Sequence, residues 1–314
     1  MEMSILFYTT FSDKKIWKNK IKKYFKNIKI VSINDKKSFK KVEYAIVWNL
    51  PDNILKKLVN LKIIFSQGAG VDHILNLPSY NKTPIVRLKD PMMGDRMANH
   101  VLSQILNFQL YLSIYSRYQN KKLWLDNLEF YTPVQNNKLT VGILGVGFLG
   151  NFVGKFLKKL KYNVVGYKKN KVSKNFGFRI YYEKEINKFI KSSDIIIAIL
   201  PATKETKNFI DKNFLNKMKN NSLLINVGRG ITLNEIDLIK HLKSKKDFYA
   251  SLDVFKKEPL SKNSEIWSLS NAIVTPHIAS ITVVESAVKQ MFLRYKKYKK
   301  TGKIINDVDL KNGY

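Results

Sequence analysis

The sequence contains no cysteine among its 314 residues. Without thiols the chain has no disulfide bond, thiolate nucleophile, iron–sulfur cluster or cysteine-ligated zinc site. Such a composition suits a reducing compartment. No stretch reaches the roughly 18 uninterrupted apolar residues that a membrane helix needs. The first 15 residues also lack the positive start and apolar centre of a signal peptide. We therefore expect a soluble, cytoplasmic protein with no membrane partner.

Arginine is scarce as well. Only six of the 56 basic residues are arginine, while 24 acidic residues leave a net charge of +32. Proteins that read nucleic acids usually depend on the planar fork of arginine. Here lysine rises together with Asn, Ile, Tyr and Phe, whose codons are A/T-rich, so codon bias accounts for the charge. We expect no nucleic-acid partner; a nucleic-acid binder would be retained on DNA in a strongly salt-dependent way.

Short β-rich runs alternate with longer helical patterns along the whole chain, which is typical of βαβ units and parallel sheets. The pattern predicts an α/β protein with two doubly wound parallel-sheet domains. A long helix is expected over 97–119, a second over 151–160 and a basic one over 283–300. The expected strands are 4–9, 29–33, 44–49, 62–66, 84–88, 140–144, 163–167, 194–200, 222–227, 249–254 and 272–275.

A glycine-rich turn follows the strand at 140–144. Gly145, Gly147 and Gly150 form G-x-G-x-x-G, and Phe148 and Leu149 begin the next helix. The first glycine permits a tight turn, the second lets the backbone approach a pyrophosphate, and the third allows close helix–strand packing. The unpaired N–H groups at a helix N-terminus attract such an anion. The motif in this context predicts a dinucleotide site.

The end of the next strand carries lysines where an acid would bind the ribose hydroxyls of NAD. The sequence there is Gly166-Tyr-Lys168-Lys169-Asn, with no carboxylate. An acid would repel a 2′-phosphate, whereas Lys168 and Lys169 would attract it. We therefore predict NADP(H) as the preferred cofactor, with NAD(H) as the alternative.

Three later strands end in rare polar residues. Arg229 lies in a glycine-flanked turn after 222–227, Glu258 follows 249–254, and His277 follows 272–275. Ligands of open parallel sheets bind beyond the carboxyl ends of the strands, so these three side chains are expected to converge. Reduction of a 2-keto acid needs such a set. Arg229 would hold the carboxylate or carbonyl oxygen, His277 would donate a proton, and Glu258 would orient the imidazole.

Three other histidines receive no chemical role, and one of them, His241, is expected on a solvated, lysine-rich helical face. His73 follows Gly68-Ala-Gly-Val-Asp and lies near the expected cleft, and His100 falls within the long helix as a packing residue.

The chain resembles the D-isomer-specific 2-hydroxyacid dehydrogenases over nearly its whole length. The motifs that carry the resemblance are VGILGVGFLG, LLINVGRG, LDVFKKEPL and TPHIAS, in that order. In that family the matching Arg, Glu and His are the substrate-binding and acid/base residues. The resemblance also implies a cofactor contact at Asp253 and a cofactor lining at Leu200, Pro201, Thr203, Val227 and Gly228.

The resemblance is strongest to the members that reduce glyoxylate and hydroxypyruvate. It rests on 45–49, 67–73, 86–88, 117–119, Trp124 and the ending 306–314. It implies that Ala69 and Gly70 offer N–H groups to the substrate carboxylate, and that Trp48 and Arg87 shape a small pocket.

The family layout implies a Rossmann cofactor domain at 100–284 inserted into a flavodoxin-like substrate domain at 1–99 and 285–314. It also implies a homodimer. The expected activity is NADPH-dependent reduction of glyoxylate to glycolate and of hydroxypyruvate to D-glycerate. The alternatives are an NAD-linked dehydrogenase for another D-2-hydroxy acid and a non-catalytic dinucleotide-binding regulator. No metal site is expected.

Overall fold

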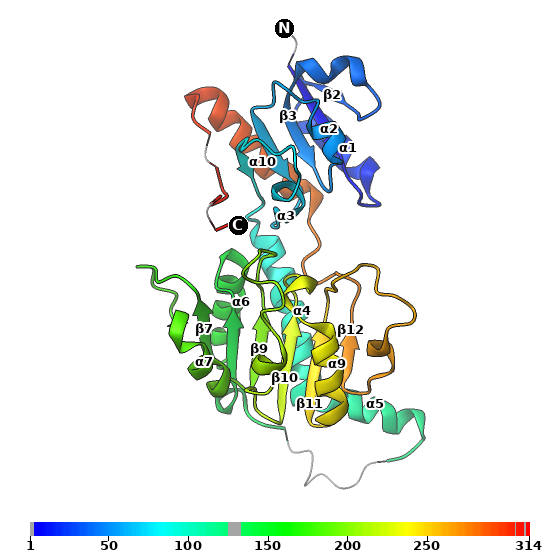
Figure 1. The fold of residues 1–314 in the computed structure, drawn as a ribbon, viewed down its shortest axis with the longest axis vertical. Coiled ribbons are helices and arrows are strands. Elements are labelled where there is room, and N and C mark those ends of the chain that lie inside the picture. The colour runs from blue at the N-terminus through cyan, green and yellow to red at the C-terminus, as the bar shows by residue number, and fades with distance from the viewer. Residues whose placement is uncertain (1–2, 125–132, 305, 311) are drawn as a thin grey trace. The chain divides into compact units, whose positions relative to one another are not determined.

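A computed structural model describes residues 3–124, 133–304, 306–310 and 312–314. The chain divides into two compact units. Unit 1 comprises 1–92 and 282–314, and unit 2 comprises 93–281. Each unit holds one parallel sheet (Figure 1).

The sheet of unit 1 has the strand order β2-β1-β3-β4-β5, and every neighbouring pair is parallel. This is the flavodoxin-like doubly wound order. Its strands are β1 (Ser4–Tyr8), β2 (Lys29–Val31), β3 (Val42–Val47), β4 (Ile63–Ser66) and β5 (Ile85–Val86). The central strands β3 and β4 are almost wholly buried, as expected for strands covered on both faces.

Helices cover both faces of this sheet. On one face α2 (Asp52–Leu55) and α3 (Asp72–Leu75) bury apolar side chains against the strands. On the other face, Tyr44 of β3 meets Tyr295 of α10 (Val284–Thr301) edge-on, with ring centroids 5.2 Å apart. The helix α1 (Lys14–Tyr24) packs beside α10 (Figure 1). Unit 1 is therefore discontinuous, because its last helix lies far along the chain from its sheet.

The sheet of unit 2 has the order β12-β11-β10-β9-β6-β7-β8 and is also parallel throughout. Its order reverses between β6 and β9, which makes that edge a topological switch point. Its strands are β6 (Thr140–Leu144), β7 (Asn163–Lys168), β8 (Arg179–Tyr182), β9 (Ile195–Ala198), β10 (Ser222–Asn226), β11 (Phe248–Leu252) and β12 (Ala272–Val274).

Two apolar clusters sandwich this second sheet. Ile195 and Ile197 of β9 pack in the cluster that contains α4 (Pro91–Gln109) and α6 (Phe148–Lys159). Ile196 and Ala198 pack in the other cluster, with α7 (Ile186–Ser192), α8 (Lys212–Leu215) and α9 (Glu235–Ser244). Alternate residues of one strand thus face opposite layers. This explains why β9 reads as an unbroken apolar run.

The predicted α/β fold with two doubly wound parallel sheets is confirmed. Every predicted strand is present, although β5 is only two residues long. The sequence did not reveal β8, a short edge strand beside β7.

The single helix expected over 97–119 is wrong. The structure has α4 and then α5 (Leu112–Asn120). Tyr111 between them adopts a left-handed φ of 57°, which a continuous right-handed helix does not allow. The Asn107 side chain accepts hydrogen bonds from the N–H and hydroxyl of Ser113 and so holds the break.

Within the described residues, no helix combines the length and apolar character needed to cross a membrane.

Candidate active site

The backbones of three loops approach one another at the carboxyl edge of the sheet in unit 2. These loops follow β6, β9 and β10. A Cβ on Gly145 would lie 2.7 Å from the carbonyl oxygen of Ile199, and one on Gly228 would lie 2.8 Å from the nitrogen of Leu200. Side chains at either glycine would force the loops apart. The predicted cofactor-lining residues around Leu200 and Gly228 therefore lie beside the glycine-rich turn, at the switch point where such sheets bind ligands.

The glycine-rich turn has the conformation that the motif predicts. Gly145 has a φ of +103°, which favours glycine. A Cβ on Gly150 would collide with the carbonyl oxygen of Gly145, so this position brings the helix close to the turn. At Gly147, by contrast, a Cβ would meet nothing within 4 Å. The turn is therefore open at the residue that precedes the free N–H groups of α6, and a pyrophosphate fits there.

The lysines at the end of β7 lie close to this turn. Lys168 donates a hydrogen bond from its Nζ to the carbonyl oxygen of Val146 over 3.1 Å. Burial and the nearby charge of Lys174 both lower the pKa of Lys168. Lys169 forms an ion pair with Glu205, with Nζ and Oε1 2.6 Å apart. The ammonium groups of Lys168 and Lys174 repel each other beside the dinucleotide turn, and a 2′-phosphate bound there would offset that repulsion.

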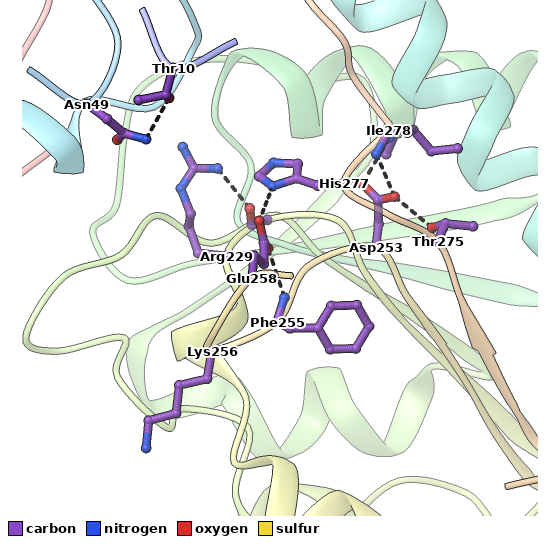
Figure 2. Close-up of polar contacts among 12 residues, drawn as sticks. Thr10, Asn49, Arg229, Asp253, Phe255, Lys256, Glu258, Thr275, His277 and Ile278 are labelled. Atoms are coloured by element: carbon purple, nitrogen blue, oxygen red, sulfur yellow. Dashed lines mark hydrogen bonds and ion pairs between the residues drawn. The ribbon is translucent and has the colours of Figure 1, made fainter. Parts of the chain in front are cut away.

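The structure brings His277 and Glu258 together at the ends of β11 and β12. The Nδ1 of His277 lies 2.8 Å from Oε2 of Glu258 (Figure 2). Arg229 lies beside this pair and donates a hydrogen bond from Nη1 to the carbonyl oxygen of Gly228 over 2.9 Å. The three residues that the sequence singled out thus form one cluster. None of their positions is close in the chain to the others.

The surroundings of Glu258 keep it ionised. Burial alone would raise its pKa. The hydrogen bonds from His277 and from the N–H of Phe255 outweigh burial, and the nearby charge of Arg229 adds to their effect, so that the pKa of Glu258 lies below its ordinary value. A carboxylate accepts hydrogen bonds only, so Nδ1 of His277 must carry the donated proton. Nε2 is then the ring atom left to exchange a proton with a ligand.

Asp253 organises the turn that carries His277. Its buried carboxylate accepts hydrogen bonds from Thr275 Oγ1 over 2.6 Å, from the N–H of Ile278 over 2.8 Å and from the N–H of Ala279 over 2.9 Å. His277 itself has a φ of 55°, a left-handed conformation that costs about 1–2 kcal/mol for a residue with a Cβ. The bonds to Asp253 hold the histidine in that strained conformation. Such strain is concentrated at functional sites.

His100 lies near Asp253, although the sequence suggested only a packing role. Burial lowers the pKa of His100, and the charge of Asp253 partly opposes that effect. Its Nε2 is buried and has no hydrogen-bond partner among the described residues. A buried polar atom without a partner needs an explanation, and a ligand at this end of the site would supply one. Its position in α4 gave no sequence signal for this.

The remaining predicted residues lie in unit 1. Trp48 follows β3 and packs on the loop that follows β4, where a Cβ on Gly68 would lie 2.6 Å from Cζ3 of the indole. Ala69 and Gly70, which are partly exposed, continue that loop. The carboxyl ends of β3 and β4 therefore bring together the tryptophan and the loop that were predicted to form a pocket.

Arg87 follows β5 in unit 1. Its neighbour Leu88 donates an N–H hydrogen bond to the carbonyl oxygen of Gly68 over 3.2 Å. Burial lowers the pKa of Arg87, against the opposing effects of Asp307 and Tyr314. Its Nε is buried and unpartnered among the residues described. No group of three or more His, Asp and Glu side chains that could hold a metal ion occurs in the described ranges.

Comparisons with known proteins identify the family of the chain. Residues 102–279 match the family model "D-isomer specific 2-hydroxyacid dehydrogenase, NAD binding domain". The chain is 31% identical to glyoxylate/hydroxypyruvate reductase A of Citrobacter koseri and 30% identical to that of Yersinia enterocolitica; each match covers 99% of this chain and 100% of the relative.

Solved structures are similar over the whole chain. One is a D-isomer specific 2-hydroxyacid dehydrogenase from Xanthobacter autotrophicus in complex with NADPH and MES, with a TM-score of 0.91, 27% identity and coverage of 100% of both chains. Another is the NADPH-dependent glyoxylate/hydroxypyruvate reductase SmGhrA from Sinorhizobium meliloti with NADP and sulfate. Its TM-score is 0.90 at 27% identity, covering 99% of this chain and 100% of the other. The present chain belongs to the D-isomer specific 2-hydroxyacid dehydrogenase family.

Proposed function

We propose that this protein is an NADPH-dependent reductase of small 2-keto acids, which converts glyoxylate to glycolate and hydroxypyruvate to D-glycerate. The observation that carries the proposal is the His277–Glu258 pair beside Arg229, at the same sheet edge as an open dinucleotide turn. The names of the full-length relatives support the same substrates.

The cofactor site consists of residues from unit 2. The turn Gly145–Gly150 and the first N–H groups of α6, at Phe148 and Leu149, suit a pyrophosphate. Lys168 and Lys169 would hold a 2′-phosphate, and NADP-bound solved relatives support this preference over NAD. The predicted lining comprises Leu200, Pro201, Thr203, Val227, Gly228 and Asp253.

The chemistry requires a hydride, a proton and a fixed substrate carboxylate. When bound, NADPH supplies the hydride. Arg229 fits the carboxylate and the carbonyl oxygen through its planar fork. His277 acts as the general acid and donates the proton of Nε2 to the carbonyl oxygen. Glu258 accepts from Nδ1 and thereby orients the ring and stabilises its protonated form.

We assign substrate binding to unit 1 and cofactor binding to unit 2. Unit 1 corresponds to the expected substrate domain at 1–99 and 285–314, and unit 2 to the expected cofactor domain at 100–284. In unit 1, the N–H groups of Ala69 and Gly70 suit the carboxylate, while Trp48 and Arg87 limit the pocket to small keto acids. The contact of Trp48 with Gly68 supports a rigid wall beside that loop.

The proposal includes a homodimer in the cytoplasm. Apolar side chains at the surface of α5 and its flanks support an interface in unit 2. Leu112 is 48% exposed, Leu123 56% and Trp124 90%. The cysteine-free chain suits a reducing compartment. Light scattering would test the dimer. A Leu112→Asp variant that stayed as large as the wild type would argue against this surface.

The decisive experiment follows NADPH and NADH oxidation with glyoxylate, hydroxypyruvate and pyruvate in parallel. The proposal expects turnover of the first two with NADPH. A preference for NADH and a larger keto acid would instead identify an NAD-linked D-2-hydroxyacid dehydrogenase. Binding of NADPH without turnover of any keto acid would identify a non-catalytic regulator.

A further inference from the structure

His73 lies beside Trp48, one of the residues proposed to bind the substrate in unit 1. It occupies the first turn of α3, directly after the loop that contains Ala69 and Gly70. Its ring contacts Asn49, which follows β3, Ser66 at the end of β4, and the indole of Trp48. The imidazole therefore contacts the predicted wall at Trp48 directly and reaches the predicted loop at Gly70 through the hydroxyl of Ser66.

The hydrogen bonds of His73 determine where its proton lies. The backbone N–H of Asn49 donates to Nδ1 over 3.1 Å, so Nδ1 must present a lone pair. The proton of the neutral ring is then on Nε2, which lies 3.2 Å from Oγ of Ser66. Protonation of both nitrogens would place two donors face to face at Asn49. The site therefore favours the neutral Nε2–H tautomer.

The Nε2 proton of His73 is the first in a series of hydrogen bonds that reaches the loop 67–70. Ser66 is fully buried, and its hydroxyl has a single hydrogen to donate. It donates that hydrogen to the carbonyl oxygen of Gly70 over 2.9 Å, and so accepts from Nε2–H of His73. The Ser66 oxygen also accepts a longer bond from the N–H of Gly68. The Nε2–H tautomer of His73 thus leaves the hydrogen of the Ser66 hydroxyl available for the carbonyl oxygen of Gly70.

The ring of His73 also contacts an aromatic side chain. The ring centroids of His73 and Trp48 are 4.2 Å apart, and Trp48 also stacks with Phe11 at 5.1 Å. Asn49, which binds Nδ1, has a left-handed φ of 53° and donates from Nδ2 to Oγ1 of Thr10 over 3.2 Å (Figure 2). Trp48 and Asn49 are therefore held by His73 and also by Thr10 and Phe11.

We propose that His73 is a positioning residue for substrate binding, which as a neutral Nε2–H imidazole fixes Trp48 relative to the loop that receives the keto-acid carboxylate. This role rests on the proposed function. His73 transfers no proton to the substrate. It sets the separation between an indole wall and two backbone N–H groups, and so determines how tightly a small 2-keto acid is bound.

Steady-state kinetics of two substitutions test the role. His73→Ala removes the hydrogen bonds with Asn49 and Ser66 and the ring contact with Trp48, whereas His73→Gln keeps an amide N–H at the reach of Nε2 to donate to Ser66. Because these contacts hold the pocket wall and the loop, we expect His73→Ala to raise KM for glyoxylate roughly 10-fold, with kcat and KM for NADPH changed less than about 2-fold. His73→Gln should recover most of the wild-type KM. The matched control is His241→Gln, on a helix of unit 2 against Phe248, which should leave KM unchanged.

A KM for glyoxylate in His73→Ala that equals the wild-type value would overturn the proposal. An equal fall of kcat in both variants, with KM constant, would also overturn it, because the residue would then act on the chemical step. Thermal unfolding of each variant shows whether it folds. If His73→Ala does not fold, the comparison of His73→Gln with the wild type retains the same test, because failure to retain a near-normal KM would contradict the hydrogen-bond chain.

A second measurement is independent of activity. The chain has four histidines, so a long-range ¹H–¹⁵N correlation spectrum of ¹⁵N-histidine protein can be assigned by the signal lost in His73→Gln. We expect a protonated Nε2 and an unprotonated Nδ1 at neutral pH. A protonated Nδ1 would overturn the arrangement. A wild-type protein that shows the expected tautomer and reduces no keto acid would refute the proposed function instead, together with the substrate role of His73.

Discussion

Replacing Glu258 by glutamine tests whether its carboxylate assists His277 as the general acid. The substitution keeps the size of the side chain and removes its charge, and with it the ion pair to Nδ1 of His277 at 2.8 Å. A hydrogen bond to a charged group contributes about 1.5–3 kcal/mol. The two side chains are 44% and 36% exposed, so water screens part of this energy. We therefore expect a loss of about 1–2 kcal/mol, which lowers kcat about 5- to 30-fold.

Initial rates with glyoxylate and saturating NADPH at neutral pH measure this loss in kcat. Glu265→Gln, which removes a well-exposed ion pair with Lys243 elsewhere in unit 2, is the matched control and should leave kcat unchanged.

A double variant shows whether Glu258 acts only through His277 or has a separate role of its own. His277→Ala should lose roughly 100- to 10,000-fold in kcat, the usual contribution of general acid catalysis. Because Glu258 acts through the imidazole, adding Glu258→Gln to His277→Ala should cost nothing more. A wild-type kcat in Glu258→Gln, or a further loss in the double variant equal to that of the single one, would refute the reasoning.

The other predictions concern substrate, cofactor and stability. Arg229→Lys keeps the charge but not the fork, so KM for glyoxylate should rise about 10-fold or more; an unchanged KM would exclude the carboxylate contact. Lys168→Ala should raise KM for NADPH and leave KM for NADH unchanged. Glu205→Gln, which removes the ion pair with Lys169, should lower KM for NADPH by up to about 5-fold. Hydrogen bonds from Lys20 and Tyr24 lower the pKa of Glu285 to about 2 from 4.5. Glu285→Gln should therefore unfold at a lower temperature than the wild type at neutral pH, and the difference should disappear as the pH falls from about 4.5 to 2.

Much of the site could be predicted because its signals are local. The turn at Gly145–Gly150 combines a strand, three glycines and a helix start within a few residues, and its conformation is as expected. Arg229, Glu258 and His277 are far apart in the chain, yet each ends a parallel strand. Since such strands end at one edge, the rule for ligand binding places them together. That the hydrogen bond joins Nδ1 of His277 to Glu258 could not be predicted, because it depends on the strained turn at His277.

The sequence by itself determined the alternation of strands and helices, the family, and the residues with rare side chains at strand ends, because these depend on periodicity and on local motifs. The tertiary structure alone decided the helix break at Tyr111, the partner of Lys169, and the surroundings of His73 and His100. In each case the deciding contact is either a backbone conformation without a glycine signal or a pairing between residues from separate elements. Neither can be predicted from local sequence patterns, because both depend on packing that exists only once the sheets have formed.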